Sequence, residues 1–250
     1  MPAATISAPA RLSLLVQRIL GWLFFVLVGP GSLFTMGVLR RNKLEGAAEA
    51  RRVYEAALAT GRPTLIACNH LTMVDSAYLQ WAMCPLWKYF ISYRRFPWNV
   101  AAVEHLKSRP PLLLICYLGK VLPIDRDGTE EHRKGVLDKL RWLLARGEVV
   151  FLFPEGTRSR TGRIDVESAT YGVGQILKDI ENPQVLCAYV RGAKQEQMSS
   201  VPHYGDTVKV ELELFEPKTT QQGLRAVRDL SRQVIEKLKQ MEDRRLGPPT

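Results

Sequence analysis

The chain has 250 residues, of which 46% are hydrophobic and 24% are charged, a composition that excludes a disordered, collagen-like or low-complexity protein. Lys and Arg outnumber Asp and Glu by 35 to 25, and the resulting formal net charge of +10 favours an anionic partner such as a membrane surface, a nucleic acid or a phosphorylated substrate. The cysteines lie singly in apolar stretches, so we expect buried, reduced thiols and no metal site. They are Cys68, Cys84, Cys116 and Cys187.

The N-terminal segment is unusually apolar, because residues 19–39 contain no charged side chain. A straight helix of that length, at ~1.5 Å per residue, would just cross a bilayer core of about 30 Å. Gly29, Pro30 and Gly31 interrupt it, which predicts either one kinked helix or two helices, 12–28 and 32–39, folded as a hairpin within one leaflet. Basic residues on both sides indicate that both ends stay near anionic lipid at the cytoplasmic face. We therefore expect residues 1–43 to anchor the chain in a membrane, as a monotopic segment or a single kinked span.

Residues 44–250 read as one α/β domain. The pattern of apolar residues predicts helices and strands that alternate along the chain, which favours a single domain with a largely parallel, mixed central sheet flanked by helices. The helices are expected at 46–60, 76–83, 110–118, from an N-cap at Asp127 to Gly147, at 169–177 and at 224–238. The strands are expected at 64–68, 88–92, 120–124, 149–153, 185–190 and 207–214.

His70 follows the predicted strand 64–68, at a place where open α/β sheets bind ligands. Asp75 comes five residues later, at the start of a helix, so a turn between them can bring the carboxylate to the imidazole. Such an aspartate would orient the histidine and stabilise its protonated form as it accepts a proton. Considered alone, the spacing arises often by chance, and a histidine that caps the helix is the simpler interpretation.

A second polar segment, Phe-Pro-Glu-Gly-Thr-Arg-Ser-Arg at 153–160, follows another buried strand. Gly156 permits a tight turn, and Arg158 and Arg160 offer planar donors that suit a phosphate. Glu155 would be costly to bury alone, so it should pair or contact a ligand. Arg126, after the strand 120–124, is a further candidate anion clamp. The alternative for residues 153–160 is an exposed loop with a local Glu–Arg pair, and the alternative for Arg126 is a surface arginine that caps a strand.

Residues 87–98 mix aromatic with basic side chains, a combination that suits a lipid headgroup interface or single-stranded nucleic acid, and equally a core strand followed by a solvated loop. The basic residues gather at the motif loops and beside the apolar anchor, so we expect no nucleic-acid partner. A histidine base with no evident Ser or Cys nucleophile indicates direct transfer to an acceptor hydroxyl.

Asn-His-x-x-x-x-Asp at 69–75, Ile-Asp-Arg at 124–126 and Phe-Pro-Glu-Gly-Thr-Arg-Ser at 153–159 stand in the order found in glycerolipid acyltransferases. Over residues 45–215 the chain resembles the 1-acyl-glycerol-3-phosphate acyltransferase (PlsC-like) branch of that family. The resemblance implies a glycerol-3-phosphate acyltransferase-like fold over 44–250, and transfer of a fatty acyl group to a hydroxyl of lysophosphatidic acid.

The resemblance also assigns roles to residues. His70 would be the general base and Asp75 its orienting group. Arg126 would hold the acceptor phosphate, and Glu155, Gly156, Thr157 and Arg158 would shape the acceptor and thioester site. Acyl-CoA or acyl-carrier protein would be the co-substrate, with no bound cofactor, and the partners would be anionic membrane lipid and a lysophospholipid acceptor. The alternatives are another lysophospholipid or lyso-aminolipid as acceptor, hydrolysis of the thioester, or a catalytically silent lipid-binding protein on the same fold.

Overall fold

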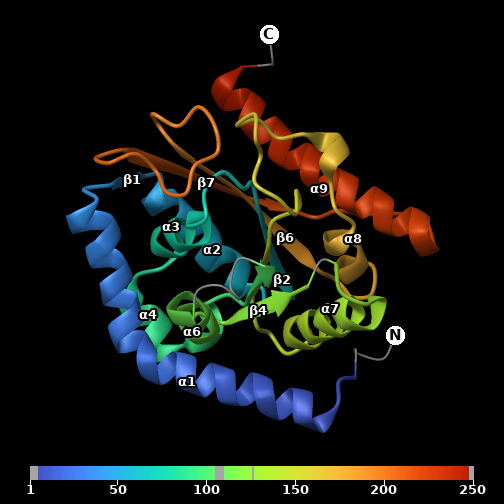
Figure 1. Cartoon of the computed structure of the whole chain (residues 1–250). Coiled ribbons are helices and arrows are strands. Elements are labelled where there is room, and N and C mark those ends of the chain that lie inside the picture. The colour runs from blue at the N-terminus through green and yellow to red at the C-terminus, as the bar shows by residue number, and fades with distance from the viewer. Residues whose placement is uncertain (1–4, 105–109, 126, 248–250) are drawn as a thin grey trace.

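The computed structural model describes residues 5–104, 110–125 and 127–247 (Figure 1). A central five-stranded sheet has the order β1-β7-β6-β2-β5. Its strands are β1 (Lys43–Glu45), β2 (Thr64–Cys68), β5 (Val150–Leu152), β6 (Gln184–Gly192) and β7 (Thr207–Phe215). β6, β2 and β5 are mutually parallel, β7 runs antiparallel to β6, and β1 is parallel to β7. The expected α/β domain with a mostly parallel, mixed sheet is confirmed.

A second, two-stranded parallel sheet continues the first one beyond β5. It contains β3 (Asn99–Ala102) and β4 (Val121–Ile124). Trp98 connects the two sheets, because its backbone N–H donates to Val149 O at 2.8 Å and its carbonyl accepts from Phe151 N at 2.7 Å. β3, β4 and β5 therefore run in the same direction as β2, and their carboxyl ends lie at the same edge.

Helices cover both faces of the sheet, as a mostly parallel sheet requires. On one face lie α2 (Ala47–Ala59), α3 (Asp75–Met83), α4 (Leu86–Ile91) and the short 3₁₀ helix η2 (Tyr93–Arg95). On the other lie α7 (Glu130–Leu144), α8 (Gly172–Leu177) and α9 (Gly223–Leu246). α6 (Pro110–Leu118) precedes β4, and the 3₁₀ helix η3 (Val166–Ser168) precedes α8. Strand residues alternate between the two cores: Ile66 and Cys68 face the first, and Leu65 and Ala67 the second.

The apolar N-terminal segment forms one continuous helix, α1 (Ala8–Leu33), which passes directly into the π-helix η1 (Phe34–Leu39). This is the kinked-helix alternative and not the hairpin. Figure 1 shows the helix bending around the flank of the domain, and Pro30, which lies inside it, removes a backbone hydrogen bond and permits such a bend. By length and composition, the stretch Ala8–Leu39 is the one described helix able to cross a membrane.

The contacts of this helix extend from one edge of the sheet to the other, in the direction of the strands. Arg18 pairs with Glu148, which lies just before β5, whereas Asn42, after the helix, donates to His203 O beyond the carboxyl end of β6. In between, Phe25 is part of the core beside α4 and η2. The helix therefore passes from the amino-terminal edge of β5 to the carboxyl-terminal edge of β6.

Some sequence-based expectations fail locally. Residues 88–92 are not a strand, because Leu86–Ile91 is the helix α4. α7 is capped by Thr129, whose hydroxyl accepts from His132 N, and not by Asp127. Cys68, Cys84 and Cys187 are buried free thiols as expected, but Cys116 is only half-buried. The short strands β1 and β3 were not expected at all.

Candidate active site

The carboxyl ends of β2, β5 and β6 meet at one edge of the sheet, and a loop follows each of them. Their alignment is fixed by the pairs Ala67 with Leu152 and Cys68 with Ala188. The loop after β2 carries His70, the loop after β5 carries Glu155 and Arg158, and a third loop, residues 193–206, follows β6. Parallel strands place such loops side by side, which is why open sheets of this kind bind ligands there.

His70 and Asp75 lie next to each other, with imidazole Nδ1 3.2 Å from carboxylate Oδ2. The same carboxylate, which is almost completely buried, accepts the backbone N–H groups of Leu71 and Thr72 at 2.7 Å each. Its other oxygen accepts the Thr72 hydroxyl at 2.6 Å. Because these donors belong to the turn between the two residues, the loop holds Asp75 against the imidazole before any substrate is bound.

Asn69 fixes the start of this loop. Its side-chain amide donates to Val190 O at 3.0 Å and its side-chain carbonyl accepts from Val190 N at 2.7 Å. The side-chain amide of Asn69 thus takes the place of a backbone partner for Val190, and it extends the pairing with β6 just beyond the end of β2. His70 consequently leaves the sheet at a fixed point.

Packing orients the imidazole as well. The ring of His70 stacks on Phe153, with centroids 3.8 Å apart and 16° between the planes. The side chain keeps 18% of its surface exposed. With Nδ1 facing Asp75, the other ring nitrogen, Nε2, is the one left for an external partner.

Glu155 exposes only 5% of its surface, and its carboxylate accepts a hydrogen bond from the backbone N–H of His70 at 3.0 Å. Burial raises the pKa of this carboxyl to about 7, and the nearby carboxylates of Glu242 and Asp75 act in the same direction. The sequence required a partner for this residue, and the described part of the chain supplies a backbone donor and no cation. A carboxyl with a pKa near neutral pH is therefore hydrogen-bonded to the backbone of the histidine.

The turn after Glu155 depends on Gly156. Its φ is +67°, and a Cβ there would lie 2.5 Å from Cγ2 of Thr170, so only glycine fits. Thr157 is exposed at the tip of the turn. Arg158, half-buried, donates from Nη1 to Ser199 O at 3.2 Å, and the next residue, Ser159, donates its backbone N–H to His70 O at 2.9 Å. The segment is therefore part of the His70 site and not a free loop.

Arg126 lies outside the described residues. Asp125, just before it, donates its backbone N–H to the Nε2 atom of His132 at 3.1 Å. Ile124, the last residue of β4, pairs with Ala102 of β3, so this strand ends at the same edge of the sheet as β2.

Sequence reasoning missed the third loop. Ser199 N donates to Leu71 O at 3.0 Å and Met73 N donates to Ser200 O at 3.1 Å, which ties residues 193–206 to the histidine loop. These are backbone contacts, and they leave no side-chain pattern in the sequence. Only the parallel register of β6 beside β2, had it been known, would have pointed to them.

Cysteine and metal chemistry find little support in the described part of the chain. Cys68 is fully buried beneath the histidine loop, and burial raises the pKa of its thiol well above the ordinary value, which disfavours a nucleophilic thiolate. Within residues 5–104, 110–125 and 127–247, no group of three or more His, Cys, Asp or Glu side chains is arranged to hold a metal ion.

Comparison with known proteins agrees with this geometry. A search of curated proteins gives no significant match. The family model described as Acyltransferase matches residues 49–190, more than half of the chain, and this range runs from α2 through β6 and includes the His70, Asp75 and Glu155 segments. The chain therefore belongs to the acyltransferase family.

Proposed function

We propose that this acyltransferase moves a fatty acyl group from acyl-CoA or acyl-carrier protein to a hydroxyl of lysophosphatidic acid, which yields phosphatidic acid. The pairing of His70 with Asp75 carries the proposal. A buried carboxylate that is already satisfied by three donors of its own turn has a fixed position, so it can hold the imidazole in one tautomer and stabilise the imidazolium.

The reaction needs one base and no covalent enzyme intermediate. His70 Nε2 takes the proton of the acceptor hydroxyl while the hydroxyl oxygen attacks the thioester carbonyl carbon. The tetrahedral intermediate then collapses, the carbon–sulfur bond breaks, and the leaving thiolate takes the proton back from the imidazolium. The Asp75 carboxylate compensates the transient positive charge of the imidazolium.

The acceptor phosphate requires cations at the same edge of the sheet. Among the described residues, Arg158 donates only from Nη1, to Ser199 O, so its other guanidinium N–H groups remain to bind a phosphate oxygen. Arg126 is proposed as the second phosphate ligand. Glu155, Gly156 and Thr157 shape the turn that positions Arg158 beside His70.

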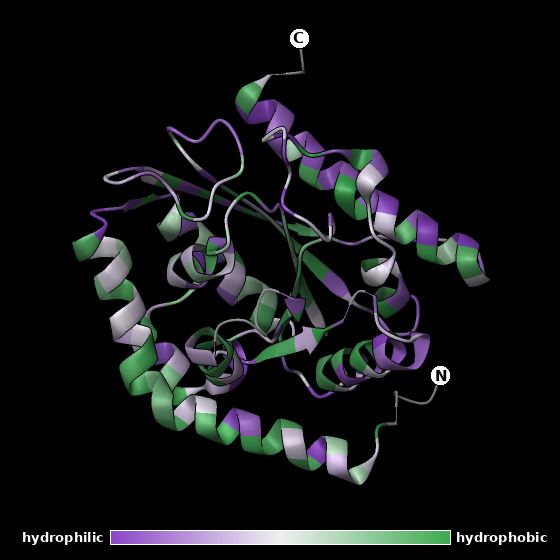
Figure 2. Ribbon diagram, in the orientation of Figure 1, coloured by the Kyte–Doolittle hydropathy of each residue, from purple (hydrophilic) through white to green (hydrophobic). Residues whose placement is uncertain are grey.

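We place the protein at a membrane, on the cytoplasmic face, with α1 lying in the plane of one leaflet. Gln17 donates to Tyr117 O and Val121 O at 3.0 Å each, and Phe25 packs in the core, so α1 is attached to the domain along its length. A membrane-spanning orientation would break these contacts. Figure 2 shows that α1 is hydrophobic along most of its length, whereas hydrophobic and hydrophilic residues alternate along α9. An in-plane helix would let the catalytic edge meet lysolipids laterally.

The test is acyl transfer by the full chain in nanodiscs, with wild type beside His70→Ala. A general base contributes about 10²–10⁴-fold, so we expect activity to fall by that factor. His203→Ala is the matched control, because His203 is exposed and lies in the third loop. Both acyl-CoA and acyl-carrier protein are offered, with lysophosphatidic acid, other lysophospholipids and a lyso-aminolipid as acceptors, and products are identified by mass.

The outcomes separate the parts of the proposal. Full activity in His70→Ala would contradict the mechanism. A diacyl product formed only from a different acceptor would replace lysophosphatidic acid and leave the mechanism in place. Thioester cleavage independent of any acceptor would identify a hydrolase, and the absence of all turnover in the folded wild type would identify a lipid-binding protein.

A further inference from the structure

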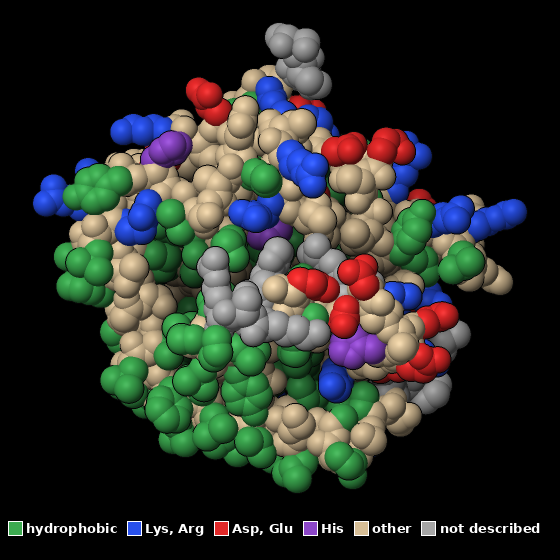
Figure 3. Space-filling model, in the orientation of Figure 1, with side chains coloured by type: hydrophobic (Ala, Val, Ile, Leu, Met, Phe, Trp, Pro, Cys, Tyr) green, Lys and Arg blue, Asp and Glu red, His purple; other side chains and the backbone are tan. Residues whose placement is uncertain are grey.

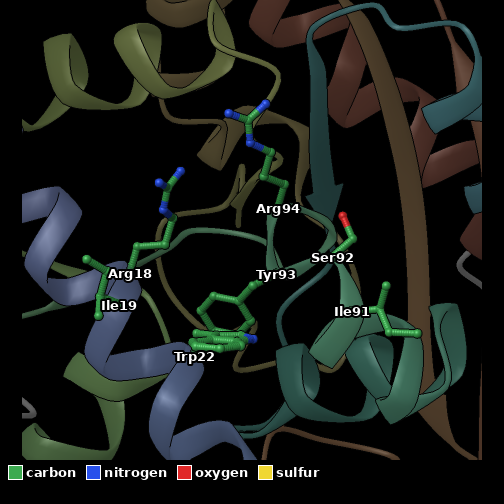
Figure 4. Close-up of a pocket in the computed structure, with 7 residues that line it drawn as sticks. All are labelled: Arg18, Ile19, Trp22, Ile91, Ser92, Tyr93 and Arg94. Carbon is green, nitrogen blue, oxygen red and sulfur yellow. The ribbon is translucent and has the colours of Figure 1, made fainter.

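A pocket of about 360 Å³ lies where α1 crosses the end of α4 and η2 (Figure 4). Its polar part consists of Arg18, Arg94 and Ser92, and its apolar part of Ile19, Trp22 and Ile91. Figure 4 shows the side chains of Arg18 and Arg94 extending to the same side of the pocket, while the ring of Trp22 lies at its other end. The volume falls within the usual range for small-ligand sites.

Positive charge is in excess around this pocket. Glu148 and Lys120 form a buried ion pair at 2.9 Å, and Arg18 binds the other oxygen of Glu148 at 3.0 Å. Arg94 is the third cation that acts on this cluster. Lys120 and Arg18 thus bind the carboxylate of Glu148, and Arg94 adds a third positive charge, which acts on Lys120. Arg94 is exposed and has no hydrogen bond or ion pair within the part of the chain that the structure describes. An anionic ligand would balance this charge.

The apolar half of the pocket is continuous with a larger hydrophobic surface. Figure 3 shows hydrophobic side chains gathered over α1, α4 and α6 in the lower part of the view. On α4, Trp87, Phe90 and Ile91 are exposed, and Trp22 of α1 stacks on Phe90 with centroids 5.6 Å apart. A ligand with an anionic head and apolar chains matches both halves, whereas a free phosphate would use only one.

This pocket is distinct from the acyl-transfer site. Arg94 lies four residues before Trp98, which pairs with Val150 at the start of β5, and Glu148 lies just before the same strand. The pocket is therefore at the amino-terminal edge of the sheet. His70 is at the opposite, carboxyl-terminal edge, so a ligand here would not be the acceptor in reaction.

We propose that this pocket binds one anionic phospholipid of the surrounding leaflet. The free guanidinium of Arg94 and the Ser92 hydroxyl contact the phosphate, Arg18 contributes its remaining N–H groups, and the acyl chains lie along Ile19, Trp22 and Ile91. The bound lipid fixes the amino-terminal part of α1 at the depth of the headgroups. The inference rests on the in-plane placement of α1 proposed above and does not depend on acyl transfer.

The test measures lipid binding without turnover. The full-length His70→Ala variant in a neutral detergent is titrated with phosphatidylglycerol, and native mass spectrometry counts the lipid retained. We expect one tightly held lipid per chain. Arg94→Gln, added to this variant, removes a charge-assisted contact and should weaken the binding about tenfold. Arg94→Lys keeps the charge and should lose less. Arg225→Gln, which removes an exposed arginine from α9, is the matched control and should bind as the parent does.

Several results would overturn the proposal. Equal binding by the Arg94→Gln and Arg225→Gln variants would exclude Arg94 as a lipid ligand. Equal retention of phosphatidylcholine would show that net negative charge is not recognised. Tight binding of glycerol 3-phosphate alone, or displacement of the lipid by stoichiometric acyl-CoA, would assign the pocket to a soluble phosphate ester or to the acyl donor. Failure of acyl transfer with every acceptor would leave this measurement unaffected, so the two proposals fail separately.

Discussion

Two buried glutamates lie at opposite ends of β5, and their surroundings shift their pKa values in opposite directions. Glu148, before the strand, would have a raised pKa from burial alone, but Lys120, with the hydrogen bonds of Trp98 and Arg18, lowers its pKa below the usual value. Glu155, after the strand, has no such cation among the residues that the structure describes, and burial raises its pKa to about 7. The amino-terminal edge therefore neutralises its buried charge, whereas the catalytic edge leaves a carboxyl poised to titrate. Groups with strongly perturbed pKa values concentrate at functional sites, and the contrast follows that rule.

The largest effect on stability is expected at the buried ion pair of Lys120 and Glu148, before the start of β5. Lys120→Met removes the buried cation that donates to Glu148 Oε2, Tyr93 O and Phe96 O. Breaking one partner of a buried ion pair costs about 3–5 kcal/mol, so thermal unfolding in a neutral detergent should shift down accordingly. The double variant Lys120→Met/Glu148→Gln should recover part of the loss. If the double variant instead loses the sum of the two single losses, the two side chains are not coupled and the comparison fails.

At the catalytic end, the effect should depend on pH. Between pH 4.5 and 7 the unfolded chain has released the Glu155 proton while the folded chain retains it, so this residue reduces stability as pH rises through that window. The shift corresponds to about 3 kcal/mol. Glu155→Gln removes the titration and should therefore gain about that much, relative to wild type, between pH 4 and pH 8. Unfolding free energies measured at both pH values test this. Parallel pH profiles for the two proteins would mean that Glu155 ionises normally.

The smallest effect is expected at Thr72, whose buried hydroxyl is the only donor to Asp75 Oδ1 among the described residues. Thr72→Val keeps the volume and removes the donor, which should cost about 2 kcal/mol because a charged atom loses its hydrogen bond. Thr72→Ser keeps the hydroxyl and serves as the control, with a loss below about 1 kcal/mol. Equal losses in denaturant unfolding would show that the methyl group matters as much as the hydrogen bond, which would contradict a dominant role of the Thr72 hydroxyl in holding Asp75.

Sequence alone predicted the parts of the fold that rest on long apolar patterns. Residues 64–68 form β2 as expected, because five consecutive buried positions bounded by Pro63 and Asn69 leave little choice. Residues 88–92 mix polar and apolar positions over too short a window to distinguish a period of two from 3.6, and they form part of the helix α4. Trp98 could not be recognised as the link between two sheets, because its role depends on backbone pairing with Val149 and Phe151.

The candidate site likewise has one part that the sequence predicted and another part that only the structure shows. His70 and Asp75 were found from their spacing, and the structure places them together. The backbone N–H groups that hold Asp75, and the donation by Ser159 N to His70 O, leave no trace in residue types. Nor could the sequence show that Glu155 has no cationic partner within residues 5–104, 110–125 and 127–247, because Arg158, three residues away, donates to Ser199 O instead. Local sequence identifies reactive groups, whereas their electrostatic surroundings depend on which loops meet.

The attachment of α1 to residues far along the chain has a consequence for biogenesis. Arg18 and its partner Glu148 are separated by 130 residues. At ~5–20 residues per second, the ribosome completes Glu148 roughly 6–26 s after Arg18. For that time the docking surface of the helix is incomplete, because α4, η2 and α6 have been made but β5 and Glu148 have not, and exposed leucines and aromatics of the helix favour aggregation in water. If α1 lies in the leaflet as proposed, bilayer insertion of the nascent helix precedes folding of the domain, and the sheet assembles beneath a helix that is already in lipid.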